Sequence, residues 1–444
     1  MRNKKQLLFL VVVFLALFLS YSFNFWSVST DMFYTYERSP EGLVIGKMAR
    51  SQQEGIFAYG GLTGRNRVVL ENGNAEEEAQ MTHSAQHDFY LTKKKLPPKY
   101  DLYKSQSGGQ AILYSVVQEI VPGDNPFKLK VVRGLNAALT ALCFMLLIGW
   151  IYRNVGFITA AITFLLLLLS PWVNNYGHNL WWSFWSFYIP FLTMLLLLER
   201  MNKHPQKFSF CKIGIAISVA VFAKCFFTGF EYITSTLLAV FSPVLYYCIV
   251  GDKKMGDFIL FSFKVGVCMV LGVLAEMFVL VLQISSLNGS LSEGVEHIIH
   301  SYTKRTNLDV DGATENLIGE GYFDILRHYL GGDAFELGFL SNNHQFGFGI
   351  LLGIICVFAF LVYLKSRKKA EEDKRTNTAL LATTAFSLLG PFSWLILFKQ
   401  HAASHPHIDF IVWYIPFLLY GFMVIGKGID ILLPIKNKIG KNKY

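Results

Sequence analysis

Long apolar runs separated by short polar segments dominate the hydrophobic pattern of this chain. Several of them reach the roughly 20 apolar residues that a helix needs to cross a bilayer, so the pattern predicts about ten transmembrane helices. These spans are expected near residues 6–24, 134–151, 155–171, 181–198, 213–229, 232–250, 257–284, 345–364, 378–398 and 408–426. The predicted fold class is therefore an all-α polytopic membrane protein, a helical bundle with two large loops on one side.

The spans divide one integral membrane unit, residues 1–444, into four regions. Residues 25–130 form a first large loop, 131–285 the central helices, 286–343 a second large loop, and 344–444 the last helices with a basic tail. Lysine and arginine are concentrated in the linkers on the side opposite the two large loops, most densely in KSRKKAEEDKR and KNKIGKNK. The positive-inside rule then predicts a multi-pass protein of the cell membrane, with both termini inside and both large loops outside the cytoplasm.

Composition agrees with a membrane protein. Hydrophobic residues make up 53% of the chain and charged residues 16%, against roughly 25% charged in a soluble domain. The basic linkers account for the net charge of +9, so no nucleic-acid partner is needed. All six cysteines fall in predicted spans or at their ends, which predicts neither a disulfide framework nor a cysteine-type zinc site.

The stretch from Tyr36 to Gly64 carries the candidate catalytic carboxylates, Glu37 and Glu41. The sequence Ser39-Pro40-Glu41 is typical of a helix start, with serine as N-cap and proline at the first helical position. Glu41 in the first turn would meet the positive end of the helix dipole. Glu37 precedes the N-cap residue of this helix, so the helix dipole does not explain it. It is therefore the first choice for a general base.

Further polar candidates follow in the first loop. Tyr103 and Gln106 lie in YKSQSGGQ, before a helix too short to span the bilayer and expected at its interface. Arg133 stands at the start of the next span, where it either reaches lipid headgroups or binds an anion. His83 and His87 could share a helix face as metal ligands, although a solvated loop is the simpler interpretation.

The order of these features, with Arg133 and with Ser170-Pro171 closing the third span, resembles the GT-C glycosyltransferases over roughly residues 30–200. The similarity is to the dolichyl-phosphate-mannose and aminoarabinose transferase branch, and to bacterial membrane proteins sharing VIGKMARSQQEGIF and FKQHAASHPH. It implies transfer of a sugar from a polyprenyl-phosphate donor to a hydroxyl of a glycan or lipid acceptor, outside the cytoplasm. The base would be an acid of the first loop, Glu37 or Glu41. No cofactor is firmly implied, and a divalent metal stays open.

Two groups in the central helices are candidates for substrate binding. His178 and Asn179 lie among tryptophans in SPWVNNYGHNLWWSFW, a mixture that suits a sugar ring, although anchoring at the membrane interface alone would explain the tryptophans. Lys224 and Glu231 bracket FFTG near the ends of two spans, where they either pair with each other or belong to the site. Glu276 is a further acid inside a span, with no obvious partner in the sequence.

The segment KQHAASHPH, between the last two predicted spans, supplies one cation and several imidazoles. Lys399, His401, His405 and His407 offer the positive charge and hydrogen-bond donors that a phosphate headgroup needs. Zinc is the alternative ligand, but Pro406 separates the last two histidines.

Two other classes of protein share parts of this pattern. A polysaccharide or lipid transporter would place charged or broken helices near the bilayer midplane, often in repeated halves, whereas here most charges gather at one boundary. An O-antigen-type polymerase would carry an arginine-rich second loop, but residues 286–343 are mostly acidic.

Overall fold

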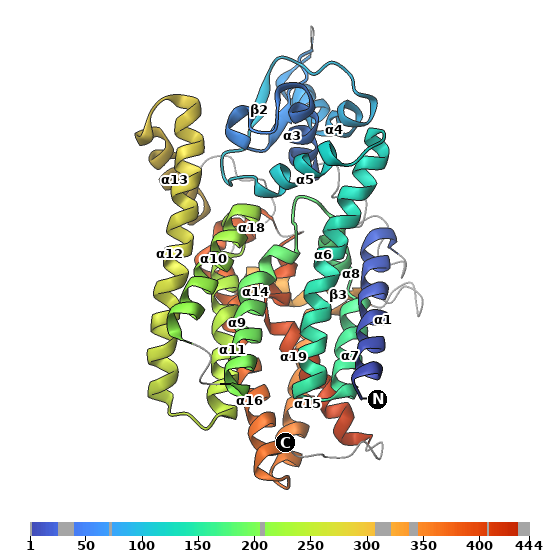
Figure 1. Cartoon of the computed structure of the whole chain (residues 1–444), viewed down its shortest axis with the longest axis vertical. Coiled ribbons are helices and arrows are strands. Elements are labelled where there is room, and N and C mark those ends of the chain that lie inside the picture. Colours follow the sequence, from blue (N-terminus) through green and yellow to red (C-terminus); the bar gives the residue numbers. More distant parts are fainter. Residues whose placement is uncertain are drawn as a thin grey trace.

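The computed structural model describes residues 2–24, 40–70, 73–204, 209–306, 321–336, 345–405 and 408–433. Most of these residues are helical. Figure 1 shows a long bundle of helices with a smaller layer of short elements at one end. This layer, residues 40–120, is called the cap, and that end of the bundle is called the cap end.

Seven helices of the described part are long and apolar enough to cross a membrane, or up to eight if one bent pair counts as a span. The protein is therefore a multi-pass membrane protein by length and composition. The seven candidates are Lys4–Phe23, Asn125–Asn154, Phe210–Thr228, Ile233–Val250, Met255–Leu287, Phe348–Ser366 and Glu371–Leu397. The spans predicted near 181–198 and 408–426 correspond to α9 (Trp185–Lys203) and α19 (Phe417–Leu432), which are not among these seven candidates. The count of about ten spans therefore stays a prediction.

The bent pair is α7 (Phe157–Leu168) and α8 (Pro171–His178), whose axes differ by 69°. Ser170 ends one helix and caps the next: its Oγ accepts a hydrogen bond from the backbone N–H of Val173 at 3.2 Å. Pro171 then occupies the first helical turn, where no backbone donor is needed. The predicted span 155–171 is thus a helix that turns sharply at the Ser-Pro pair.

The cap consists of short elements that pack on one another. They are α3 (Gly42–Glu54), η2 (Ala58–Gly61), β1 (Gly64–Asn66), α4 (Ala75–Thr92), β2 (Tyr100–Leu102) and α5 (Gly109–Ile120). β1 and β2 pair antiparallel, with Gly64 opposite Leu102. α3 ends at Gly55, whose φ of +95° favours glycine, and the predicted short helix after YKSQSGGQ is confirmed.

The solvated loop that was the simpler interpretation around His83 and His87 is wrong, because both residues lie on α4. Asn74 caps this helix by accepting from the backbone N–H groups of Glu76 and Glu77, and the Glu77 carboxylate accepts from the N–H of Asn74 in return. Such a capping box stabilises a helix start without any apolar stripe. The second predicted loop likewise contains helices, α13 (Leu291–Thr306) and α14 (Tyr322–Gly331).

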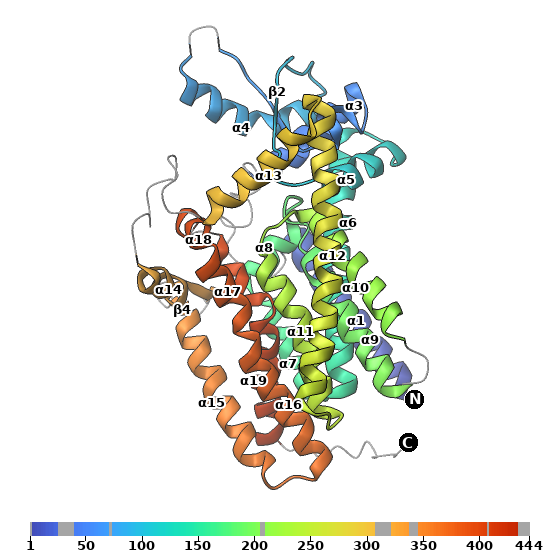
Figure 2. The ribbon, with the colours of Figure 1, turned by 90° about the vertical axis from the view of Figure 1, so that its left-hand side faces the viewer.

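Two long helices connect the bundle to the cap. α6 (Asn125–Asn154) starts directly below it, and α12 (Met255–Asn288) reaches it from the other side, as Figure 1 shows. On α12, the Gln283 side chain donates to the carbonyl oxygens of Gly60 at 2.8 Å and Ser107 at 3.1 Å. α13 then folds back from the cap end of α12 toward α18 (Lys399–Ser404), which Figure 2 shows from the side.

The remaining helices complete the bundle. They are α1 (Arg2–Phe23), α10 (Phe210–Thr228), α11 (Ile233–Val250), α15 (Phe348–Ser366), α16 (Glu371–Ser387), α17 (Leu389–Leu397) and the 3-10 helix η4 (Asp409–Tyr414). The strands β3 (Asp333–Glu336) and β4 (Gln345–Gly347) pair beside α14 and α15.

Basic linkers meet at the end of the bundle away from the cap. Arg375 at the start of α16 forms an ion pair with Asp252, in the α11–α12 turn, at 2.9 Å. Arg153 at the end of α6 pairs with Glu199 of α9 at 2.7 Å. The charge asymmetry seen in the sequence is therefore an asymmetry between the two ends of the bundle.

Candidate functional site

The Glu41 carboxylate lies where the cap meets the bundle, immediately before α3. It is fully buried. The Arg133 side chain of α6 donates to both of its oxygens, Nη2 to Oε2 at 2.7 Å and Nε to Oε1 at 3.3 Å. The backbone N–H of Leu180 donates to Oε1 at 3.3 Å, and the His87 Nε2 of α4 lies 3.4 Å from Oε2. One carboxylate thus joins the cap, α6 and the segment after α8.

These partners determine the charge of the site. Burial by itself raises the pKa of the Glu41 carboxyl, but the Arg133 guanidinium and the contact with His87 outweigh it and hold this pKa well below its usual range. Glu41 is therefore an anion at neutral pH and a weak base. Its structural role differs from the predicted one: it is the N-cap residue of α3, and its side chain makes no capping hydrogen bond.

Arg133 does bind an anion, which was one of the two alternatives, and that anion is a carboxylate of the protein itself. Its side chain remains 22% exposed. Glu37 and Ser39 lie outside the described residues, and the role of Glu37 stays a prediction.

The other first-loop candidates pack against the bundle rather than against Glu41. The Tyr103 ring meets the Trp181 ring edge-on, with centroids 5.2 Å apart. Gln106 is buried beside the turn after α10. There Gly229 has φ +59°, and a Cβ on it would lie 2.7 Å from the Gln106 Cβ, so the close approach requires glycine.

Glu276 of α12 has a partner that the sequence did not reveal. The Ser107 hydroxyl donates to its Oε1 at 2.6 Å, and both residues are buried. This bond lies two helical turns from the Gln283 contact on the same helix. Together they fix the YKSQSGGQ segment on α12.

In the segment from His178 to Trp185, polar side chains contact the backbone of the protein. His178 Nδ1 lies 2.9 Å from the Tyr21 carbonyl oxygen, and the Asn179 side chain accepts from the backbone N–H of Trp181 at 2.9 Å. The tryptophans here, at positions 172, 181, 182 and 185, are all buried. They therefore lie inside the protein, and the predicted belt at the membrane interface is wrong.

A second ionic cluster surrounds His401 of α18. Its Nδ1 lies 3.0 Å from Oδ2 of Asp409, and its Nε2 lies 3.4 Å from Oε2 of Glu231. The Tyr232 hydroxyl and the Trp394 indole also donate to Asp409, at 2.9 and 3.0 Å. Burial lowers the pKa of His401, but the two carboxylates outweigh it and raise this pKa to about 10. The imidazole is therefore a fixed cation at neutral pH.

Aromatic rings connect the two clusters. Trp182, two residues after Leu180, stacks on Tyr176 with centroids 4.6 Å apart and faces Tyr232 at 6.2 Å. Tyr232 in turn bonds to Asp409. A chain of aromatic contacts thus links the Glu41 and His401 clusters.

The two predicted lysines lie near the His401 cluster. Lys224 donates to the carbonyl oxygens of Gly229 at 2.8 Å and Glu231 at 2.5 Å, so it fixes the turn between α10 and α11. Lys399 lies over the Tyr322 ring, its Nζ 4.8 Å from the centroid. Such a contact leaves ammonium N–H donors for an anion.

His405 stacks on His401 with ring centroids 4.4 Å apart. Burial and the neighbouring cation lower the pKa of His405, so it is neutral at pH 7. His407 lies outside the described residues. Among the described residues, no three histidine, cysteine or carboxylate side chains are grouped to hold a metal ion.

Sequence reasoning missed Asp409 as the residue that organises the His401 cluster. Its signal was present: a lone acid three residues after Pro406, in an otherwise apolar run, is rarely buried without a partner. From the sequence, His87 is a candidate only for metal binding, because nothing local points to Glu41.

Comparison with known proteins adds no relative. No family model, curated protein or solved structure matches this chain.

Proposed function

We propose that this protein is a membrane glycosyltransferase that moves a sugar from a polyprenyl-phosphate donor to a hydroxyl of a cell-envelope glycan or glycolipid. In this proposal the cap faces away from the cytoplasm and the basic linkers face it, in agreement with the positive-inside rule. The resemblance to the GT-C glycosyltransferases suggested the reaction, and the arrangement of charges at the cap end supports it.

The observation that carries the proposal is a pair of ionic clusters with buried carboxylates, linked through aromatic rings. Carboxylates and cations lie together there: Glu41 with Arg133, and His401 with Glu231 and Asp409. Transfer from a lipid phosphate needs a base for the acceptor hydroxyl and cations for the departing phosphate.

The proposed reaction uses these residues as follows. The acceptor oxygen attacks the anomeric carbon and its proton passes to a carboxylate, while the bond from that carbon to the phosphate oxygen breaks. Glu37 is the base, because Glu41 is held as a weakly basic anion. Glu41 positions Arg133, and Arg133 with Lys399 stabilises the negative charge that develops on the departing phosphate.

Three substitutions test this assignment in a transfer assay with a lipid-linked sugar donor. Glu37→Gln should abolish transfer at normal expression, since a general base contributes about 10²–10⁴-fold. Glu41→Gln should leave measurable activity in a less stable protein. Glu54→Gln is the matched control, because Glu54 lies at the far end of α3 and pairs with Arg50, one turn before it. If Glu37→Gln transfers sugar at the rate of the control, the catalytic role of this stretch is wrong.

One observation favours a second candidate, a polysaccharide or lipid transporter. The α7–α8 pair is bent by 69°, and broken helices are typical of substrate sites in transporters. Purified protein in vesicles separates the two candidates: a transporter moves a labelled lipid-linked sugar across the bilayer with no acceptor present, and a transferase does not.

A further inference from the structure

The helix α13, in the second predicted loop, has three different faces. One face packs on α12, where a Cβ on Gly294 would lie 2.9 Å from the carbonyl oxygen of Val281. On the same face, Ile298 packs against a small buried cluster that includes Leu280 of α12. A second face is exposed and polar, and it is formed by Ser292, Glu293, Glu296 and His300.

The third face of α13 is apolar and nevertheless exposed. It is called the apolar stripe and consists of Leu291, Val295, Ile299 and Tyr302, which are between 47% and 63% exposed. At 3.6 residues per turn, these four positions fall within about 80° of the helix surface. They lie between the face that packs on α12 and the polar face. An exposed apolar patch rimmed by polar residues marks a surface of interaction.

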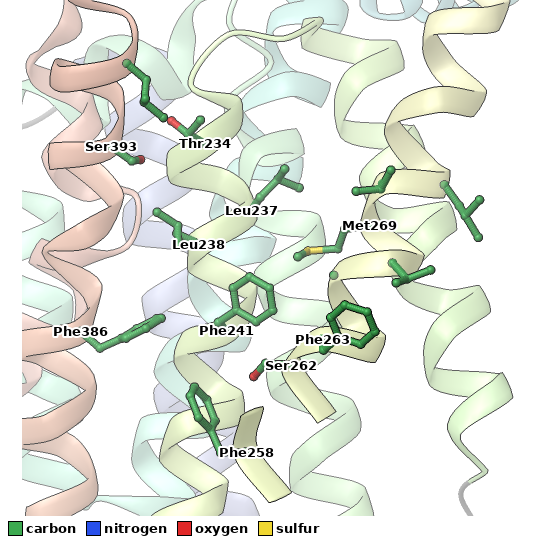
Figure 3. A pocket seen from close by; sticks show the side chains of 15 residues that line it. Thr234, Leu237, Leu238, Phe241, Phe258, Ser262, Phe263, Met269, Phe386 and Ser393 are labelled. Carbon is green, nitrogen blue, oxygen red and sulfur yellow. The ribbon is translucent and has the colours of Figure 1, made fainter. Parts of the chain in front are cut away.

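The position of α13 relative to the bilayer follows from its contacts with α12. Phe258 and Met269 of α12 line an apolar groove of the bundle, shown in Figure 3, as expected for the hydrocarbon part of this helix. Counted from Phe258, a hydrocarbon core of about 30 Å takes about 20 residues and ends near Phe278. Leu280, which lies at the level of Ile298 on α13, is about 3 Å farther along the helix. The headgroup layer on each side of the core is about 5–7 Å thick, so α13 lies within that layer.

The surroundings of the stripe favour lipid over another protein. On α12, Phe278 and Leu282 are also exposed, so the apolar surface of the membrane helix continues up to the level of α13. A stable protein interface uses roughly 20–30 residues on each side, far more than the four of this stripe. Tyrosine, here Tyr302, is also enriched where a membrane meets water.

We infer that α13 is an interfacial helix, whose apolar stripe inserts among the phospholipids of the leaflet at the cap end while its polar face remains in water. An apolar face next to a polar one is what such helices use to lie in the plane of the interface. Because α13 also contacts α18, it fixes the helix that carries His401 relative to the membrane surface. The inference goes beyond the proposed function and does not require sugar transfer.

Spin labels on two sides of α13 test this in the full-length protein, reconstituted in phospholipid nanodiscs. The exposed native cysteines, Cys211 and Cys356, are first replaced by alanine. The readout is the collision rate of the label with oxygen, which concentrates in hydrocarbon, divided by its collision rate with a water-soluble nickel chelate. This ratio should be several-fold higher for Val295→Cys than for Glu293→Cys. Glu293→Cys is the matched control, because it lies two residues away on the polar face of the same helix.

Two results would overturn the inference. Equal ratios at the two positions would place the apolar stripe in water. Low collision rates with both reagents at position 295 would show that protein covers the stripe, either another part of this chain, a second copy or a different partner.

A photoactivatable phospholipid covers the case in which a labelled variant does not fold. With a diazirine near the headgroup end of its acyl chain, this lipid should label α13 of the wild type and leave α4 unlabelled. The helix α4 is the matched control, because it belongs to the cap and exposes an apolar side chain, Met81, to a similar degree. Labelling of α13 that is no stronger than that of α4 would contradict the insertion of the stripe.

Discussion

Arg133→Met is the substitution whose effect follows most directly from the structure. It removes the guanidinium that donates to both oxygens of the fully buried Glu41 carboxylate. Leaving a buried charge without its partner costs about 3–5 kcal/mol. The free energy of unfolding should fall by that amount, because the backbone N–H of Leu180 and the His87 contact replace only part of the lost interaction.

The matched control is Arg67→Met, which removes another arginine–carboxylate pair of the cap. Arg67 and Asp101 lie 2.9 Å apart, but their side chains are 47% and 44% exposed. Water replaces a partner at such a site, so the loss should stay below about 1 kcal/mol. The two substitutions therefore differ in burial and not in chemistry.

Chemical denaturation in mixed micelles gives both free energies, and a double-mutant cycle isolates the pair. Arg133→Met combined with Glu41→Met should be more stable than Arg133→Met alone, since no uncompensated charge remains. The folded pKa of Glu41 is lowered, so the pair stabilises the wild type above about pH 4.5 and loses this effect as the pH falls further. Equal losses for Arg133→Met and Arg67→Met, or a double variant that loses the sum of both single changes, would refute the reasoning.

Three further predictions use other parts of the molecule. The pKa of His401 is raised, so its cluster stabilises the protein fully below about pH 6.5 and loses this effect as the pH approaches 10. The melting temperature of His401→Gln should therefore change less with pH over that range than the melting temperature of the wild type. Identical pH profiles of the two proteins would contradict this prediction. Lys399→Ala should weaken use of the lipid-linked donor by about 1.5–3 kcal/mol, and unchanged kinetics would remove Lys399 from the site. An impermeant thiol reagent on intact cells should label Ala75→Cys and spare Ala370→Cys, and the reverse pattern would contradict both the orientation and the proposed reaction.

Features that depend on neighbouring residues were predictable from the sequence. Gly55 ends α3, the Gly108-Gly109 pair precedes α5, and Ser170-Pro171 marks the break between α7 and α8. Each follows from the conformational limits of one or two residue types.

The contacts of the candidate site join residues far apart in the chain, and this is why the sequence did not reveal them. Glu41 meets Arg133 across 92 positions, and Ser107 meets Glu276 across 169. Nothing local distinguishes these partners from other polar residues. The helix α4 was missed for a different reason: it carries no apolar stripe, and its capping box at Asn74 was the one available signal.

The length of α12 links the cap to the thickness of the membrane. This helix has 34 residues, about 51 Å at the helical rise, whereas the hydrocarbon core measures about 30 Å. Its surplus length carries Gln283, which bonds to two loops of the cap. A change in bilayer thickness that tilts α12 would therefore act on the two cap loops that Gln283 holds.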